Sequence, residues 1–197
     1  MKEAIHILKE EHRSISAVLL GLKHLAQMAQ DARLRPEFAV FRSMVRYTDE
    51  YPEKLHHPKE DRHLFARLLE RAPQARALVE TLQAEHVRGA ELIRDLERKL
   101  LFLEEGWPAG AREFLEAVNA YAEFHWKHMR REEHELLPLA EKHLTAEDWR
   151  EIDAAFAANQ DPIRGVQEKD FQALFSRIAH LAPAPIGLGD PWKRVPA

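Results

Sequence analysis

The chain has 197 residues, of which 45% are hydrophobic, so it can bury the core of one domain. It has no cysteine, which excludes disulfides, thiolate catalysis, iron–sulfur clusters and thiolate zinc sites. A formal net charge of −4 gives no basic field, so nucleic acid is not an expected partner. We expect no membrane association and a cytoplasmic protein, because the sequence has neither a long apolar run nor the order of a signal peptide.

The first expected helix begins near the N-terminus and has one histidine in its apolar stripe. Apolar residues recur at alternating steps of three and four from Ile5 to Ala26, and His12 occupies one of these positions. The segment 31–36 then breaks the pattern. His12 is therefore expected to point into a core.

The second expected helix runs from about residue 37 to residue 70 and contains the sequence HHPKED. His56 precedes Glu60 by four positions, so both side chains leave one face of a helix. Pro58 lies between them and would kink the helix. The local rotation could bring His57 inward in place of His56, or bring both inward; the match to a later motif favours His56.

The third expected helix begins after Pro73 and repeats the features of the first. Its apolar stripe extends from Leu82 to Leu103 and includes His86. Gly89 lies on the same stripe, where it would let a neighbouring backbone or a ligand approach closely.

The fourth expected helix has three polar residues where its apolar stripe should continue. These are His125, His128 and Glu132, and the last two repeat the four-residue spacing of the second helix. Imidazoles and a carboxylate in a core each cost several kcal/mol unless they are paired or bound to a cation. This helix therefore gives the strongest indication of a metal site.

The last part of the chain is expected to be an appendage to the bundle. Thr145 to Asp148 resembles a capping box that opens a short helix, and a further helix is expected at about 167–180. The Pro- and Gly-rich tail is expected to be extended and to lie on the surface through Trp192. We predict a bundle over residues 1–143, with C-terminal helices and a tail over 144–197 packed on it.

The histidines indicate a helix pair that is used twice. His12 and His86 are 74 positions apart, and His56 and His128 are 72 apart. The expected fold is therefore all-α, an up-down four-helix bundle with a short C-terminal helical extension. Four imidazoles and two carboxylates suffice for two metals with open coordination positions, and such ligands accept iron, manganese or zinc.

This pattern resembles the hemerythrin-like family, also described as HHE cation-binding domains, over roughly residues 1–143. The resemblance implies a four-helix bundle around a non-haem di-iron centre, with an oxo, hydroxo or water bridge and room for dioxygen. The ferritin-like arrangement differs, because its glutamate and histidine are three positions apart. The residues that match the family ligands are His12, His56, Glu60, His86, His128 and Glu132.

The sequence departs from the animal oxygen carriers of this family at one ligand. Those proteins have a second histidine four residues from the third-helix ligand, where this chain has Leu82 and Ala90. One histidine ligand is therefore missing or supplied elsewhere. His57 and His125 are the candidates; otherwise each would support a ligand by donating a ring N–H to a carboxylate.

We predict a non-enzymatic or weakly enzymatic di-iron protein that binds dioxygen, nitric oxide or peroxide for sensing, small-molecule handling or iron homeostasis. The missing histidine argues against durable oxygen carriage. One alternative is a di-iron oxidoreductase acting on peroxide or nitric oxide, and another is a structural zinc or manganese site. The sequence indicates no catalytic residue. Tyr121 lies on the inward stripe of the fourth helix, so it is the first tyrosine to test for a hydrogen bond to a bound oxygen species. The chain is expected to be a monomer or homodimer.

Overall fold

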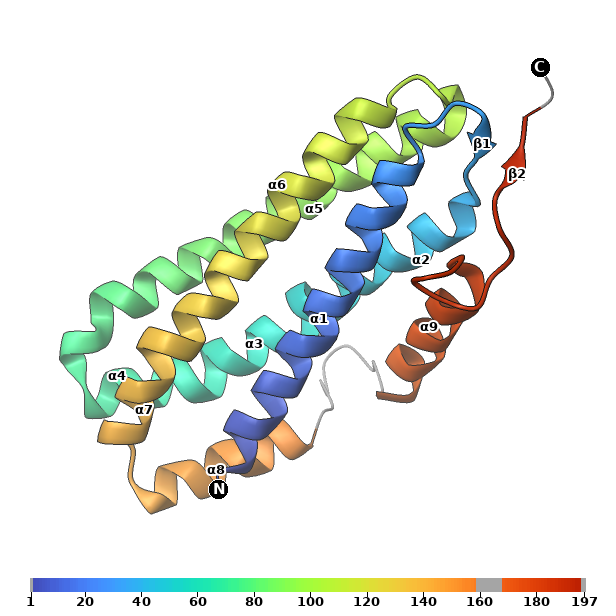
Figure 1. The fold of residues 1–197 in the computed structure, drawn as a ribbon. Helices are drawn as coiled ribbons and strands as arrows, with labels where there is room; N and C mark the ends of the chain where they lie inside the picture. Colours follow the sequence, from blue (N-terminus) through green and yellow to red (C-terminus); the bar gives the residue numbers. More distant parts are fainter. Residues whose placement is uncertain (1, 159–167, 196–197) are drawn as a thin grey trace.

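The computed structural model describes residues 2–158 and 168–195, with the side chains of 168–172 outside the description. Four helical arms lie side by side and alternate in direction (Figure 1). The all-α bundle predicted from periodicity is confirmed. The first arm is α1 (Glu3–Met28), and the third consists of η3 (Pro73–Ala75) and α5 (Arg76–Gly106). The second arm consists of α2 (Phe38–Thr48), η1 (Asp49–His56), α3 (His57–Lys59), η2 (Glu60–Phe65) and α4 (Ala66–Arg71). The fourth arm consists of α6 (Ala111–Arg131), η4 (Glu132–Leu136) and α7 (Leu137–His143).

The second arm changes its helical register twice. η1 and η2 are π-helical, and the short α-helical segment α3 lies between them. Pro52 lies inside η1 and Pro58 in α3, and neither residue can donate the backbone hydrogen bond of a regular helix. The wider turns alter which side chains face the bundle, so consecutive residues of this arm can both point inward.

The apolar core consists of two clusters separated by a band across the bundle. On α1, the clusters are separated between Leu8 and Ile15, and on α5 between Leu82 and Ile93. The first cluster includes Leu22, Phe41, Leu96 and Phe114; the second includes Leu8, Phe65, Leu82 and Leu136. The lone histidines of α1 and α5 lie in the intervening band, between two packed apolar layers.

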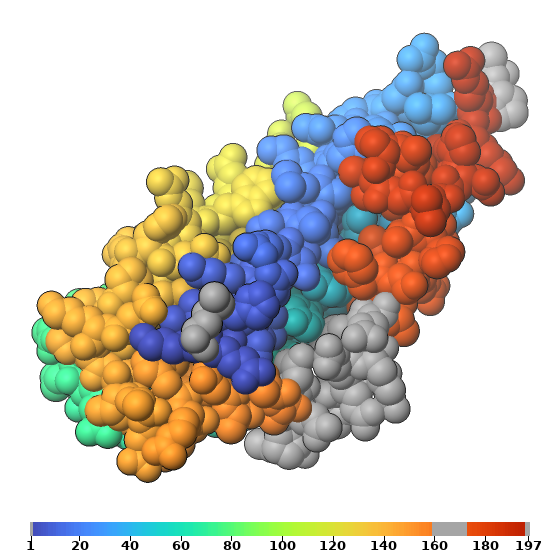
Figure 2. All heavy atoms as spheres, turned by 60° about the horizontal axis from the view of Figure 1, so that its bottom comes forward, coloured from blue at the N-terminus to red at the C-terminus, as the bar shows by residue number. Residues whose placement is uncertain are grey.

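The C-terminal elements cover the outside of the bundle. α8 (Ala146–Ala157) packs on α1, and α9 (Glu168–Leu181) packs on α2. Figure 2 shows the C-terminal residues, in red, lying along the flank beside α1. No helix in the described part of the chain is long and apolar enough to cross a membrane.

The tail pairs with the segment between α1 and α2. A two-residue strand, β2 (Lys193–Arg194), pairs antiparallel with β1 (Leu34–Arg35). This pairing draws Trp192 into the first apolar cluster, where its ring centroid lies 5.9 Å from that of Phe41. Trp192 is therefore the residue through which the tail is held on the bundle, and residues 31–36, which look like a plain loop in the sequence, supply the strand partner.

Asp148 connects α8 to the second arm. Its carboxylate accepts hydrogen bonds from Thr145, which completes the predicted capping box, and from the Arg71 guanidinium at 2.9 and 3.0 Å. The side chain is buried. The Arg71 guanidinium holds the pKa of this carboxyl well below its ordinary value, so the group is charged near neutral pH.

Replacing Asp148 by alanine is expected to lower the free energy of unfolding by about 2 kcal/mol, because both the capping box and the ion pair between the buried carboxylate and Arg71 are lost. Urea unfolding followed by circular dichroism would measure this loss. The control is Glu147→Ala in the same turn, whose exposed side chain pairs with Arg150 and whose loss should cost less than about 0.5 kcal/mol. Equal losses in the two variants would contradict the assignment.

Candidate metal centre

Seven polar side chains from all four arms meet in the band between the apolar clusters. Each is at most 8% exposed, although such groups are rarely buried unless they are partnered. α1 and α5 supply one each, and the second and fourth arms supply the others. The seven are His12, His56, His57, Glu60, His86, His128 and Glu132.

These side chains form two groups of potential ligands, and within each group one atom of every residue lies within 4.8 Å of the others. Glu60 belongs to both groups. Glu132 belongs to the first, and its Oε1 also lies 3.2 Å from His128 Nε2 in the second. Two carboxylates therefore face both groups. The first group is His12, His56, Glu60 and Glu132; the second group is His57, Glu60, His86 and His128.

The central polar atoms lie close together, and the two central carboxylates make no hydrogen bond within the described part of the chain. Among the described residues, all four carboxylate oxygens of Glu60 and Glu132 lack a hydrogen-bond partner. His12 Nε2 and His56 Nε2 lie 3.2 Å apart, and the same distance separates the corresponding nitrogens in the second group. Lone pairs that converge from nitrogen and oxygen fit divalent cations, which would satisfy all of them together.

Four of the imidazoles also have a carboxylate on their outer side. Their Nε2 atoms face the central glutamates, and each Nδ1 is bonded to a carboxylate from another arm. Such a partner fixes the tautomer and orientation of a metal-binding histidine. The Nδ1 pairs are His12 with Glu133 at 2.8 Å, His56 with Glu11 at 2.6 Å, His86 with Asp61 at 3.2 Å and His128 with Glu85 at 3.0 Å.

These outer carboxylates follow the repeat of the two halves. Glu11 and Glu85 each precede a lone helix histidine, and each pairs with the leading histidine of the next arm. Asp61 and Glu133 each follow a central glutamate, and each pairs with a lone histidine. Each of the four is the direct neighbour of a ligand residue in the sequence, which is the signal that could have identified them.

His57 has no counterpart in this repeat. It is buried beside His56, belongs to the second group, and stacks on His86 with ring centroids 4.1 Å apart. Its Nδ1 lies 3.3 Å from Glu53, one turn earlier on the same arm. The register changes around Pro58 bring both histidines inward, which the sequence had left as one of two alternatives.

His125 belongs to neither group. Its Nε2 lies 3.3 Å from Glu53 Oε1, and the Tyr121 hydroxyl donates to the same oxygen at 3.2 Å. Gly89 makes room for this carboxylate, because a Cβ there would meet Glu53 Oε1 at 2.8 Å. His125 therefore supports Glu53 on the far side from His57. Sequence reasoning missed Glu53, although it precedes His57 by four positions.

Burial and neighbouring charges set the protonation of the centre. Burial lowers the pKa of His12, but the carboxylates of Glu132 and Glu133 outweigh it and raise the value to about 9. His128 behaves alike, since Glu132 overcomes burial and raises its pKa to about 10. Burial and the Glu132 carboxylate raise the pKa of Glu60. A cation that enters the centre must therefore displace protons.

Comparison with known proteins gives one result for this part of the chain. A family model described as the hemerythrin HHE cation-binding domain matches residues 3–140. This range includes all seven side chains of the band. No curated protein matches the chain.

Metal binding is expected to strengthen as the pH rises from 7 to 9. The pKa values of His12 and His128 lie above neutral, so both rings carry protons that compete with the cation and are lost as the pH rises. Zinc titration at several pH values would measure the affinity, and a pH indicator would measure the released protons. An affinity independent of pH over this range would contradict the protonation described above.

His57→Ala is expected to lower the metal content per chain relative to the wild-type protein, because the second group loses one of its three imidazoles. His125→Ala is the matched control: it removes a buried imidazole that belongs to neither group and should retain the wild-type metal content. Elemental analysis after gel filtration would measure both. Equal loss in the control would contradict the distinction between the two histidines.

Proposed function

The chain belongs to the hemerythrin HHE cation-binding family, and from this premise we propose that it is a non-haem di-iron protein that binds dioxygen, nitric oxide or peroxide. The observation that carries the proposal is the pair of histidine groups sharing Glu60, with four central carboxylate oxygens that have no hydrogen-bond partner among the described residues. Sensing, small-molecule handling and iron homeostasis are the roles that such binding would serve.

The proposed ligand set contains five imidazoles and two bridging carboxylates. His57 then supplies the imidazole that the third helix lacks at Leu82 and Ala90. The first group would offer two imidazoles to a metal and the second group three, so an octahedral ion would retain more open positions in the first group. The expectation against durable oxygen carriage depended on a missing imidazole, and His57 removes that reason. The ligands would be His12 and His56 at the first metal, His57, His86 and His128 at the second, and Glu60 and Glu132 at both.

The residues of the chain determine the surroundings of this centre. When bound, the two irons would supply redox and Lewis-acid chemistry. Phe65 stacks near His86 and belongs to the second apolar cluster, so the centre is closed to bulk water on that side. The Tyr121 hydroxyl pairs with Glu53, and it therefore supports the outer carboxylate of His57.

The proposal predicts about two irons per chain after anaerobic loading with ferrous iron, followed by visible charge-transfer bands when air is admitted. Iron analysis and absorption spectroscopy would measure both, and the lifetime of the oxygenated species would separate a carrier from a sensor or an oxidase. Glu132→Ala should lose iron because it removes a carboxylate that faces both groups. Glu135→Ala changes an exposed carboxylate on the same arm and should not.

Three results would count against this proposal. The first is a failure to take up iron, and the second is a single colourless ion per chain. The third is preferential retention of zinc or manganese without redox change, which would indicate a structural site whose main effect is on thermal stability.

A second candidate function is an oxidoreductase that acts on peroxide or nitric oxide. The more open first group favours it, because turnover requires a position where substrate and product exchange. Peroxide consumption by the iron-loaded protein should then exceed that of the same amount of free iron and disappear in Glu132→Ala. Consumption no faster than free iron would leave binding as the function.

A further inference from the structure

Among the positions at which the two halves of the chain differ is the one directly after each leading histidine. His56 and His128 are equivalent in the repeat, and so are the central glutamates, 72 positions apart. The residue after each leading histidine is His57 in one half and Met129 in the other. The place that an imidazole fills in the first half is thus taken by a thioether in the second. Met129 belongs to the first apolar cluster and is only 5% exposed.

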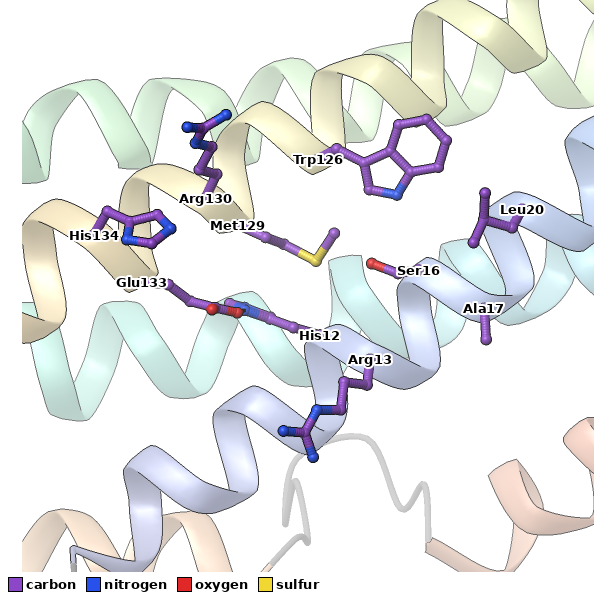
Figure 3. A pocket seen from close by; sticks show the side chains of 10 residues that line it. All are labelled: His12, Arg13, Ser16, Ala17, Leu20, Trp126, Met129, Arg130, Glu133 and His134. Carbon is purple, nitrogen blue, oxygen red and sulfur yellow. Dashed lines mark hydrogen bonds and ion pairs between the residues drawn. The ribbon is translucent and has the colours of Figure 1, made fainter.

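Met129 lines a hollow between α1 and α6, hereafter the α1–α6 hollow. Its volume is about 400 Å³, a size typical of small-molecule sites and far beyond that of dioxygen. Figure 3 shows His12 and Glu133 facing one another at one end, with Met129 and Ser16 beside them and Trp126 further along. A ligand of the first group therefore lies in the wall of this hollow.

The lining of the hollow combines apolar surface with positive charge. Leu20 is 56% exposed and Trp126 is partly buried, which gives an apolar floor that is open to solvent. Arg13 and Arg130 flank the hollow from α1 and α6, as Figure 3 shows. Lys23 lies 5.8 Å from the Trp126 ring and adds a further cation close by.

The carboxylate of the hollow does not balance this charge. Glu133 is engaged by His12 Nδ1 at 2.8 Å. Arg13 is paired with Glu10 at the surface and adds no net charge, while no ion pair is found for Arg130 or Lys23 among the described residues. On a chain with a net charge of −4, these two cations and the Trp126 ring favour an anion with an apolar body.

We propose that the α1–α6 hollow binds a small aromatic anion, which lies over Met129 at the wall shared with His12. The unbranched side chain of Met129 can adapt to an occupant, and Met129 comes directly after His128 in the sequence. The relation of this occupant to bound iron rests on the proposed function, whereas its binding to the hollow does not.

The probe for binding is 8-anilinonaphthalene-1-sulfonate, an aromatic sulfonate whose fluorescence rises in an apolar site, titrated into the protein as purified. Arg130→Glu reverses a charge at the hollow, and Ala17→Trp fills it; each is expected to raise the dissociation constant at least fivefold. Arg112→Glu makes the same charge change at an exposed site elsewhere on α6 and should alter it less than twofold. Equal binding by all variants would overturn the proposal.

Iron content is measured in the same samples, so the two proposals can fail separately. Two irons with unchanged probe binding in the hollow variants would overturn the hollow alone, and probe binding without iron would overturn the di-iron function alone. Circular dichroism confirms that Ala17→Trp is folded, and Arg130→Glu, a surface change, tests the hollow independently of it.

Access to the first group gives a second readout. Azide uptake by the iron-loaded protein, followed by stopped-flow absorption, should slow at least threefold when the hollow is saturated with the sulfonate, because the occupant covers Met129. In Ala17→Trp, added sulfonate should have no effect on the azide rate. An unchanged rate in the wild-type protein would show that the occupant does not lie on the approach to His12.

Discussion

The burial of two glutamates at the centre of the bundle is the constraint on which the rest of the structure depends. Glu60 and Glu132 are fully buried, and their oxygens have no hydrogen-bond donor among the described residues. An uncompensated carboxylate in such a place costs several kcal/mol, so imidazoles and cations must surround it. Five histidines therefore surround the two carboxylates for an electrostatic reason as well as for the binding of a metal.

The apolar clusters on either side of the polar band hold the helices in place. Each arm contributes residues to both clusters, so the helices are fixed at both ends of the band. The outer carboxylates then fix the direction of four of the rings, and two of these carboxylates are themselves paired with cations: Glu11 with Lys59 and Glu85 with Arg131. Positions and orientations are therefore determined by packing and by hydrogen bonds that do not involve the cation, which is the arrangement that a precise metal site needs.

The features that could be predicted from the sequence are those that follow regular helix geometry. His12 and His86 lie on stripes with the ordinary period, and the family resemblance, which the match over residues 3–140 confirms, located the two central glutamates. The inward position of His57 could not be derived, because it depends on π-helical turns around Pro58 that periodicity does not describe. The strand pairing beside Trp192 could not be predicted for a related reason: it joins two-residue strands from distant segments, and two residues carry no periodic signal.

The same local irregularity makes the two metal groups chemically different. In a strict repeat, both would have two imidazoles and the same surroundings. The register change of the second arm adds His57 and its partner Glu53 on one side, while the regular α6 presents His125 and Met129 at the equivalent positions. Glu53 and His125, equivalent in the repeat, meet each other across the bundle. Glu53 and His125 thus flank the second group, whereas His12 of the first group lines the α1–α6 hollow together with Met129. Two prolines in one arm therefore coincide with the point at which a duplicated helix pair becomes an asymmetric centre.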